Sequence, residues 1–246
     1  VIGVTAVACG TLMSNGVNCI VASGISLIIG VVIGLFNGVL INEIGMFPMI
    51  ATLGMMTSLR GVAYLITGGL PVYGIPKSYL ILGQGYFMGV PVPVIIMVIV
   101  FAIGYIILNK TVFGRTVYGI GGNPEASRLS GISVKKVTYK IYALEGVLAA
   151  LAGIILLSRV NSGQPTAGSG YEMDIITACV LGGVSITGGE GKIGGVLIGV
   201  LIMGVLTNGM ILMNINEFWQ WVVKGMVLLL AVAIDKISQK RKLKVK

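Results

Sequence analysis

Histidine is absent from this 246-residue chain, and cysteine and acidic residues are scarce. Without histidine the sequence lacks the commonest metal ligand and the commonest general base. Cys9, Cys19 and Cys179 lie in or beside apolar runs and have no paired spacing, which is typical of small buried residues. The sequence therefore predicts no disulfide framework, no metal site and no catalytic set of Ser/His/Asp or Cys/His type.

Nucleotide-binding motifs are also missing from the sequence. Gly191-Lys192 is followed by Ile193 and lacks the upstream glycine of a P-loop, and the GxGxxG that begins at Gly119 has Pro124 in its last position. We therefore expect no cofactor in this chain. Uphill transport would need an ion gradient or another subunit, and the sparseness of acidic residues in the apolar runs argues against ion coupling.

Apolar residues dominate what is present. They make up 56% of the chain, charged residues make up only 10%, and the mean hydropathy is +1.00. These values indicate an all-α polytopic membrane protein with one transmembrane domain over residues 1–235. The formal charge of +9 is concentrated in two places, a central loop at 110–136 and a tail at 236–246. The positive-inside rule predicts both in the cytoplasm, facing anionic lipid rather than nucleic acid.

Six apolar runs are long enough to cross a membrane, which takes about 20 residues. They are residues 20–41, 48–67, 93–109, 137–157, 193–213 and 218–234. A run at 1–13 resembles the end of a span whose start is absent, and a run at 175–186 predicts a broken or partly buried helix. The polar segments at 68–90 and 159–174 are expected outside, the first with a short surface element.

Two sets of glycines recur at four-residue spacing and predict close packing of helix backbones. They are Gly30, Gly34 and Gly38, and Gly191, Gly195 and Gly199. Arg60 and Glu145 are charged residues that lie well inside apolar runs. Arg60 either faces a polar interior or ties down neighbouring helix ends, and Glu145 is either part of a polar pathway or a paired carboxylate near the inner interface.

The central loop contains a predicted short helix. Asn123 is a favourable N-cap, Pro124 suits the first helical position, Glu125 complements the helix dipole and Gly131 supplies a left-handed stop. Two turns of helix are too short to be stable alone, so the segment needs a surface to lie against. From the residues alone it is either a solvated connection or a docking element for another protein. Ser133 is expected to cap the next membrane helix.

Three long segments carry a resemblance to a known family. They are GRTVYGIGGNPEASRLSGISVKKV at 114–137, LAALAG at 148–153 and QPTAGSGYEMDIITACVLGGVSITGGEGKIGG at 164–195. The sequence resembles the permease subunits of bacterial monosaccharide ABC importers of the ribose, xylose and galactose type. The resemblance covers nearly the whole chain and is densest from Gly114 to Gly209.

The resemblance implies a type II importer-like fold in the bacterial cytoplasmic membrane, with the C-terminus cytoplasmic and with N-terminal helices missing from this chain. It also implies partners: a separate ABC ATPase subunit that binds ATP and magnesium, an extracytoplasmic sugar-binding protein, and a second permease subunit in a homodimer. The chain itself is then a transporter subunit without its own ATPase site.

Site residues follow from this resemblance and from polarity. The coupling element to the ATPase is expected at Asn123, Pro124, Glu125, Ser127, Arg128, Leu129 and Gly131, with the turn at 188–195 as a second cytoplasmic contact. The substrate pathway is expected at Asn37, Thr52, Met56, Arg60 and Asn208. The outer gate or binding-protein contact is expected at Gln164, Pro165, Tyr171, Glu172 and Asp174.

Three alternatives remain open on the sequence alone. A permease for branched-chain amino acids belongs to the same superfamily, although the segment at 164–174 favours the sugar branch, within which autoinducer and inositol importers also fall. A secondary transporter or channel would function without an ATPase. A membrane-embedded enzyme is the weakest alternative, because the residues that it would need are absent.

Overall fold

The fold is almost entirely helical. The computed structural model describes residues 1–244, and side chains up to residue 237. Its elements are α1 (Ile2–Ser14), α2 (Cys19–Asn42), α3 (Pro48–Thr67), η1 (Lys77–Leu80), α4 (Ile81–Gln84), β1 (Tyr86–Phe87), β2 (Val90–Pro91), α5 (Val92–Lys110), α6 (Val112–Gly122), α7 (Pro124–Leu129), α8 (Val134–Val160), α9 (Tyr171–Leu181), α10 (Ile193–Leu212) and α11 (Glu217–Lys244). β1 and β2 form a small antiparallel hairpin.

Within the described residues, six helices are long and apolar enough to cross a membrane. They are α2, α3, α5, α8, α10 and the segment Glu217–Ile237 of α11. These are the six runs predicted from the sequence, with ends that differ by a few residues, so the prediction of an all-α polytopic protein is confirmed. α11 continues to Lys244, and the side chains of the predicted basic tail from residue 238 onward lie outside the described residues.

The helices group into two compact units. The first contains Val1–Ile99 and Ser133–Gly168, and the second contains Val100–Ile132 and the chain from Ser169 onward. The boundary falls inside α5, and the central polar interval belongs to the second unit up to Ile132. The single transmembrane domain over residues 1–235 stays a prediction.

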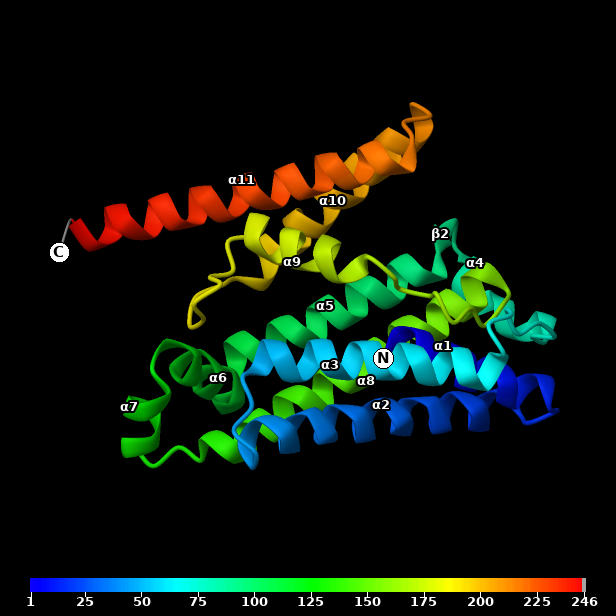
Figure 1. Ribbon diagram of the computed structural model, residues 1–246, viewed down its shortest axis with the longest axis horizontal. Helices are drawn as coiled ribbons and strands as arrows, with labels where there is room; N and C mark the ends of the chain where they lie inside the picture. Colours follow the sequence, from blue (N-terminus) through cyan, green and yellow to red (C-terminus); the bar gives the residue numbers. More distant parts are fainter. Residues whose placement is uncertain (245–246) are drawn as a thin grey trace. The chain divides into compact units, whose positions relative to one another are not determined.

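The first unit is built on a close contact between α2 and α8, which lie side by side in Figure 1. A Cβ atom at Gly34 would collide with the Tyr142 carbonyl, and a Cβ atom at Gly30 would collide with the Gly146 carbonyl. Gly38 lies in the same way against the ring of Tyr139. The predicted close packing along this glycine face is confirmed, because only glycine lets the two backbones approach this far.

α1 forms the core of the same unit. It has 13 residues and is shorter than the six candidate spans. Its buried residues Ala6, Cys9 and Met13 pack with Ile154 and Leu157 of α8. The apolar run at 1–13 therefore supplies interior surface on every side, which explains why it shows no polar face.

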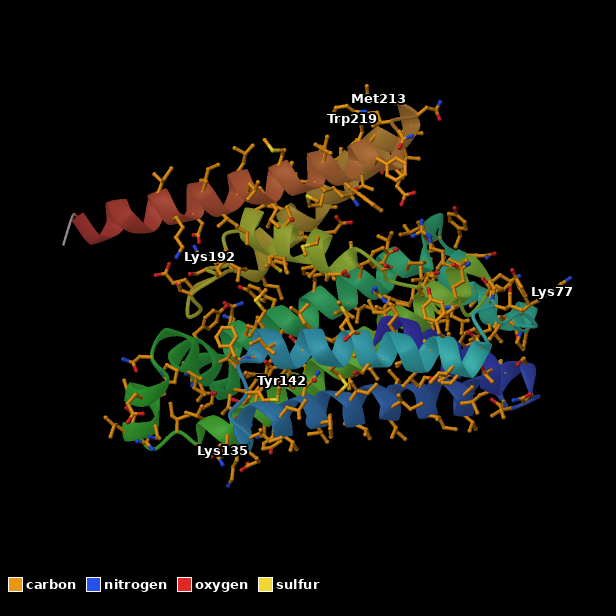
Figure 2. All side chains as sticks on the ribbon, viewed as in Figure 1. Lys77, Lys135, Tyr142, Lys192, Met213 and Trp219 are labelled. Carbon is orange, nitrogen blue, oxygen red and sulfur yellow. The ribbon has the colours of Figure 1, made fainter. Side chains whose placement is uncertain are left out.

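The end of the first unit that carries η1 is fixed by hydrogen bonds to α8. The buried Ser158 hydroxyl donates to the Tyr79 carbonyl and accepts from the Gly83 amide, each at 2.8 Å. An isolated bridge also pairs Val72 with Gly163. The short surface element expected within residues 68–90 is thus present as η1, α4 and the hairpin. Figure 2 shows Lys77 at this end and Lys135 at the opposite end of the unit.

In the second unit α9 packs against both α10 and α11. A Cβ atom at Gly199 would collide with the Ala178 carbonyl, and one at Gly195 with the Gly182 carbonyl, so these two glycines make the predicted close contact. The prediction was wrong for Gly191, which precedes α10 and lies against the Val184 side chain. The four-residue spacing would place Gly191 on the same face as Gly195 and Gly199 only if Gly191 were helical. α10 begins two residues later, at Ile193.

The short helix predicted at 175–186 exists, but its bounds were wrong. α9 begins at Tyr171, directly after Gly170 with φ of +83°, and ends at Leu181 before Gly182 and Gly183. Its 11 residues span about 16 Å, roughly half of the hydrocarbon thickness. The acidic residues Glu172 and Asp174 stand in its first turn, where the helix dipole favours them.

Alanine substitutions on α2 test the role of backbone approach. We expect Gly34→Ala to destabilise the protein by about 1–3 kcal/mol, because the added methyl overpacks the contact with α8. Gly24→Ala on the same helix meets nothing within 4 Å and should raise the stability by up to about 1 kcal/mol. Unfolding in detergent, followed by tryptophan fluorescence, measures both variants. Equal stabilities for the two would contradict the packing argument.

Candidate functional site

The central polar interval contains two helices. α6 precedes α7, and only α7 was predicted from the sequence. Thr111 caps α6 by accepting a hydrogen bond from the Gly114 amide at 3.2 Å. Gly119, Gly121 and Gly122 lower helix propensity within α6, which is why propensity did not reveal it. The signal that could have revealed it is the threonine cap followed by apolar residues at helical spacing.

The short helix α7 has the predicted caps. The Asn123 side-chain oxygen accepts a hydrogen bond from the Ala126 amide at 2.9 Å, and Pro124 occupies the first helical position. Gly131 has φ of +82°, and the Ile132 amide donates to the Ser127 carbonyl at 3.1 Å to close the helix end. These bonds hold six residues in a helix that would not persist alone.

The side chains of α7 divide between an inner and an outer face. Ser127 is 7% exposed and its side chain faces Gly119 of α6, which suits it to holding α7 in place rather than to contacting a partner. Glu125 and Arg128 form an exposed ion pair at 2.8 Å. Leu129 is 79% exposed. α7 thus presents one unburied leucine beside a fixed pair of opposite charges.

A polar contact joins the start of α8 to the end of α2 in the first unit. Lys135 donates to a Glu43 carboxylate oxygen at 2.7 Å, and the Tyr139 hydroxyl donates to the other at 3.3 Å. The hydrogen bond from Lys135 holds the pKa of the Glu43 carboxyl below its usual range. Ser133 occupies the N-cap position of α8, but its side chain makes no cap hydrogen bond, so the capping role expected for it was wrong.

The residues expected along the substrate pathway lie on three helices. Thr52, Met56 and Arg60 follow one face of α3 at four-residue spacing, and all three are half-buried. Asn37 of α2 is 7% exposed, and its side-chain oxygen is buried with no hydrogen-bond partner among the described residues. Asn208 lies in the second unit, exposed on α10. Their role in a pathway stays a prediction.

The residues expected at the outer gate do not form one loop. Gln164 and Pro165 lie in the connection after α8, where the Gln164 amide donates to the Ser162 hydroxyl at 3.2 Å. Tyr171, Glu172 and Asp174 lie in the first turn of α9. These three positions are fixed by helical geometry, and a role at an outer gate stays a prediction.

Asp174 has a partner that was not predicted from the sequence. Lys224 of α11 pairs with it at 2.7 Å, and the two side chains are only 26% and 21% exposed. The second Asp174 oxygen is buried and lacks a hydrogen-bond partner among the described residues. Lys224 lies seven residues into α11, about 10 Å along its axis. A lone lysine within an apolar run was the signal available in the sequence.

Within the described residues no group of three or more His, Cys, Asp or Glu side chains could hold a metal ion. The three cysteines are free. Glu145 is exposed on α8. Among the described residues, the predicted site residues thus include α7, the half-buried face of α3 and the Asp174 partner of the ion pair between α9 and α11.

A double-mutant cycle of Asp174→Asn and Lys224→Met tests the ion pair. We expect a coupling free energy of about 1–2 kcal/mol, since the pair is mostly shielded from water. The exposed pair Glu125–Arg128 is the control and should give about 0.3–0.5 kcal/mol. The measurement is the free energy of unfolding in detergent. A coupling no larger than that of the control would show that the pair does not hold α9 to α11.

Known proteins resemble this chain along most of its length. A family model described as the permease component of branched-chain amino acid transport systems matches residues 1–232. The ribose import permease protein RbsC of Bacillus subtilis is 51% identical over 234 residues, which cover 94% of this chain and 72% of that protein.

Two proteins of Escherichia coli K12 are also similar. Its ribose import permease protein RbsC is 44% identical over 97% of this chain and 75% of that protein. Its L-arabinose transport system permease protein AraH is 46% identical over 84% of this chain and 63% of that protein. No solved structure matches the chain. The resemblance drawn from the sequence is thus confirmed: this multi-pass membrane chain belongs to the family of transport-system permease components.

Proposed function

We propose that this chain is the permease subunit of an ABC importer that moves a monosaccharide across the bacterial cytoplasmic membrane. The observation that carries the proposal is its identity of 44–51% to permeases named for ribose import, over more than nine-tenths of its length. A permease named for arabinose transport is 46% identical. The substrate class is therefore a pentose or a closely related monosaccharide.

The chain receives its energy from a separate ATPase subunit. Its sequence has no P-loop, so ATP and magnesium bind the partner. α7 is the element through which the two subunits couple. Its exposed Leu129 is an apolar anchor, since full burial of a leucine contributes about 1.5–3 kcal/mol, and its capped ends keep the anchor in one position. Glu125 and Arg128 flank this anchor and set its orientation on the partner.

Transport proceeds by alternating access without covalent chemistry. Closure of the ATPase dimer on ATP displaces α7, and the displacement tilts the spans around a pathway in a homodimer of permeases. An extracytoplasmic binding protein delivers the sugar to the side that carries Gln164 and Tyr171. The binding protein supplies selectivity, so the pathway needs only weak hydrogen bonding from residues such as Asn37 and Thr52. The C-terminus and α7 lie on the cytoplasmic side.

A branched-chain amino acid is the second candidate substrate, and the description of the matching family favours it. The relatives reported above carry sugar names at 44–51% identity, which is the more specific resemblance. A transporter that works without an ATPase is less favoured, because such a transporter would have no ATPase partner to cover the exposed Leu129 of α7.

Leu129→Asp tests the coupling role of α7. We expect the dissociation constant of the permease–ATPase complex to rise roughly 10–100-fold, the factor that corresponds to losing a buried leucine. Arg128→Glu should weaken the complex as well, by breaking the ion pair with Glu125. Leu70→Asp is the matched control, because Leu70 is 71% exposed in the segment predicted on the outer side. Retained association of Leu129→Asp would overturn the assignment of α7.

Uptake by proteoliposomes tests the substrate class. Vesicles that contain the permease and its ATPase, supplied with the binding protein and internal ATP, should accumulate labelled ribose or arabinose and not leucine. Omission of ATP should abolish accumulation. Sugar uptake by the permease alone would refute the importer, and uptake of leucine in place of sugar would assign the chain to the amino acid branch.

A further inference from the structure

The loop between α9 and α10, residues 182–192, is folded onto α6. A Cβ atom at Gly121 would lie 2.6 Å from the Gly189 amide nitrogen, and one at Gly188 would lie 2.7 Å from the Gly121 carbonyl oxygen. The Tyr118 hydroxyl donates to the Gly191 carbonyl at 3.1 Å. Figure 1 shows the loop, in yellow, at the end of the second unit that carries α6 and α7.

The loop is also closed upon itself. The Ser185 amide donates to the Glu190 carbonyl at 2.9 Å, and the Gly188 amide donates to the Ser185 carbonyl at 3.1 Å. The hydroxyls of Ser185 and Thr187 are hydrogen-bonded at 2.8 Å. Gly188 and Gly189 have positive φ, which these turns require. The backbone therefore fixes the position of the residue at the tip, which is Ile186.

Ile186 is 54% exposed at this tip. It lies close enough to α7 for one partner protein to contact both. Along the loop, Ile186 is two residues from Gly188, and Gly188 contacts Gly121 of α6. Along α6, Gly121 is two residues from Asn123, the N-cap of α7. With about 3.8 Å per step and about 9 Å along α7, Ile186 and Leu129 are at most about 30 Å apart. A standard interface of about 800 Å² per partner is about as wide.

The chemistry around Ile186 favours a protein over a lipid surface. Segments that enter the membrane interface carry several apolar or aromatic residues with basic neighbours. Ile186 is instead flanked by two hydroxyl residues, and it is the one exposed large apolar side chain within residues 182–192, all of which the structure describes. A single apolar side chain on a rigid polar turn resembles Leu129 on α7.

We propose that residues 182–192 form a second docking element for the same ATPase subunit, with Ile186 as its apolar contact. The loop begins at Gly182, which ends α9, and closes at Lys192, the N-cap of α10. Figure 2 shows Lys192 at one end of α10 and Met213 at the other. When the ATPase displaces α6 and α7, the contact of Gly121 with Gly188 and Gly189 moves the loop, and the loop moves α9 and α10. This inference rests on the proposed function.

Ile186→Asp tests the docking role in the assembled importer. We expect the dissociation constant for the ATPase subunit to rise roughly 10–100-fold. Ile81→Asp is the matched control, since Ile81 is 64% exposed on α4 in the segment predicted on the outer side, and it should change the constant less than twofold. A photoreactive phenylalanine analogue at position 186, and not at position 81, should crosslink to the ATPase even if the aspartate variant assembles poorly.

Comparison with Leu129→Asp separates this inference from the proposed function. If Leu129→Asp loses the ATPase while Ile186→Asp keeps it and position 186 gives no crosslink, the loop is not a docking element and the importer assignment stands. If both variants keep the ATPase, the coupling assignment fails as well. Crosslinks from position 186 to lipid alone would assign the loop to the membrane surface and overturn the proposal.

Discussion

Close backbone contact at glycine is the interaction on which each unit of this protein depends. Lipid tails are as apolar as the helices, so the hydrophobic effect does not bring helices together within the membrane, and packing must do so. Gly30 and Gly34 let α2 reach the carbonyls of α8, and Gly195 and Gly199 let α10 reach α9. Contact at Gly121 and Gly189 extends the same principle to the loop that lies on α6.

These contacts also explain how a short helix keeps one fixed form. α7 has six residues and no stability of its own, and its form depends on Asn123, Gly131 and the buried Ser127. Ser127 rests on α6, and α6 rests on the loop at 182–192. Leu129 is therefore carried by a connected set of elements rather than by a free segment.

Charges in this chain are few, and several form contacts between elements. Lys224 joins α11 to Asp174 of α9, and Lys135 joins α8 to Glu43 at the end of α2. The first pair is mostly shielded and the second is exposed, so removing one partner alone should cost more at the first pair. Each pair thus links two helices at a defined position along their lengths.

Local properties of the sequence determined the six candidate spans, the caps of α7 and the glycine face of α2. Apolar length and cap chemistry depend on neighbouring residues, and they can be recognised wherever the chain later folds. The tertiary structure alone decided that Ser127 faces inward, against Gly119 of α6. It also decided the partners of Asp174 and Glu43, which lie 50 and 92 residues away. Those partners depend on which helices lie side by side, and no local pattern carries that information.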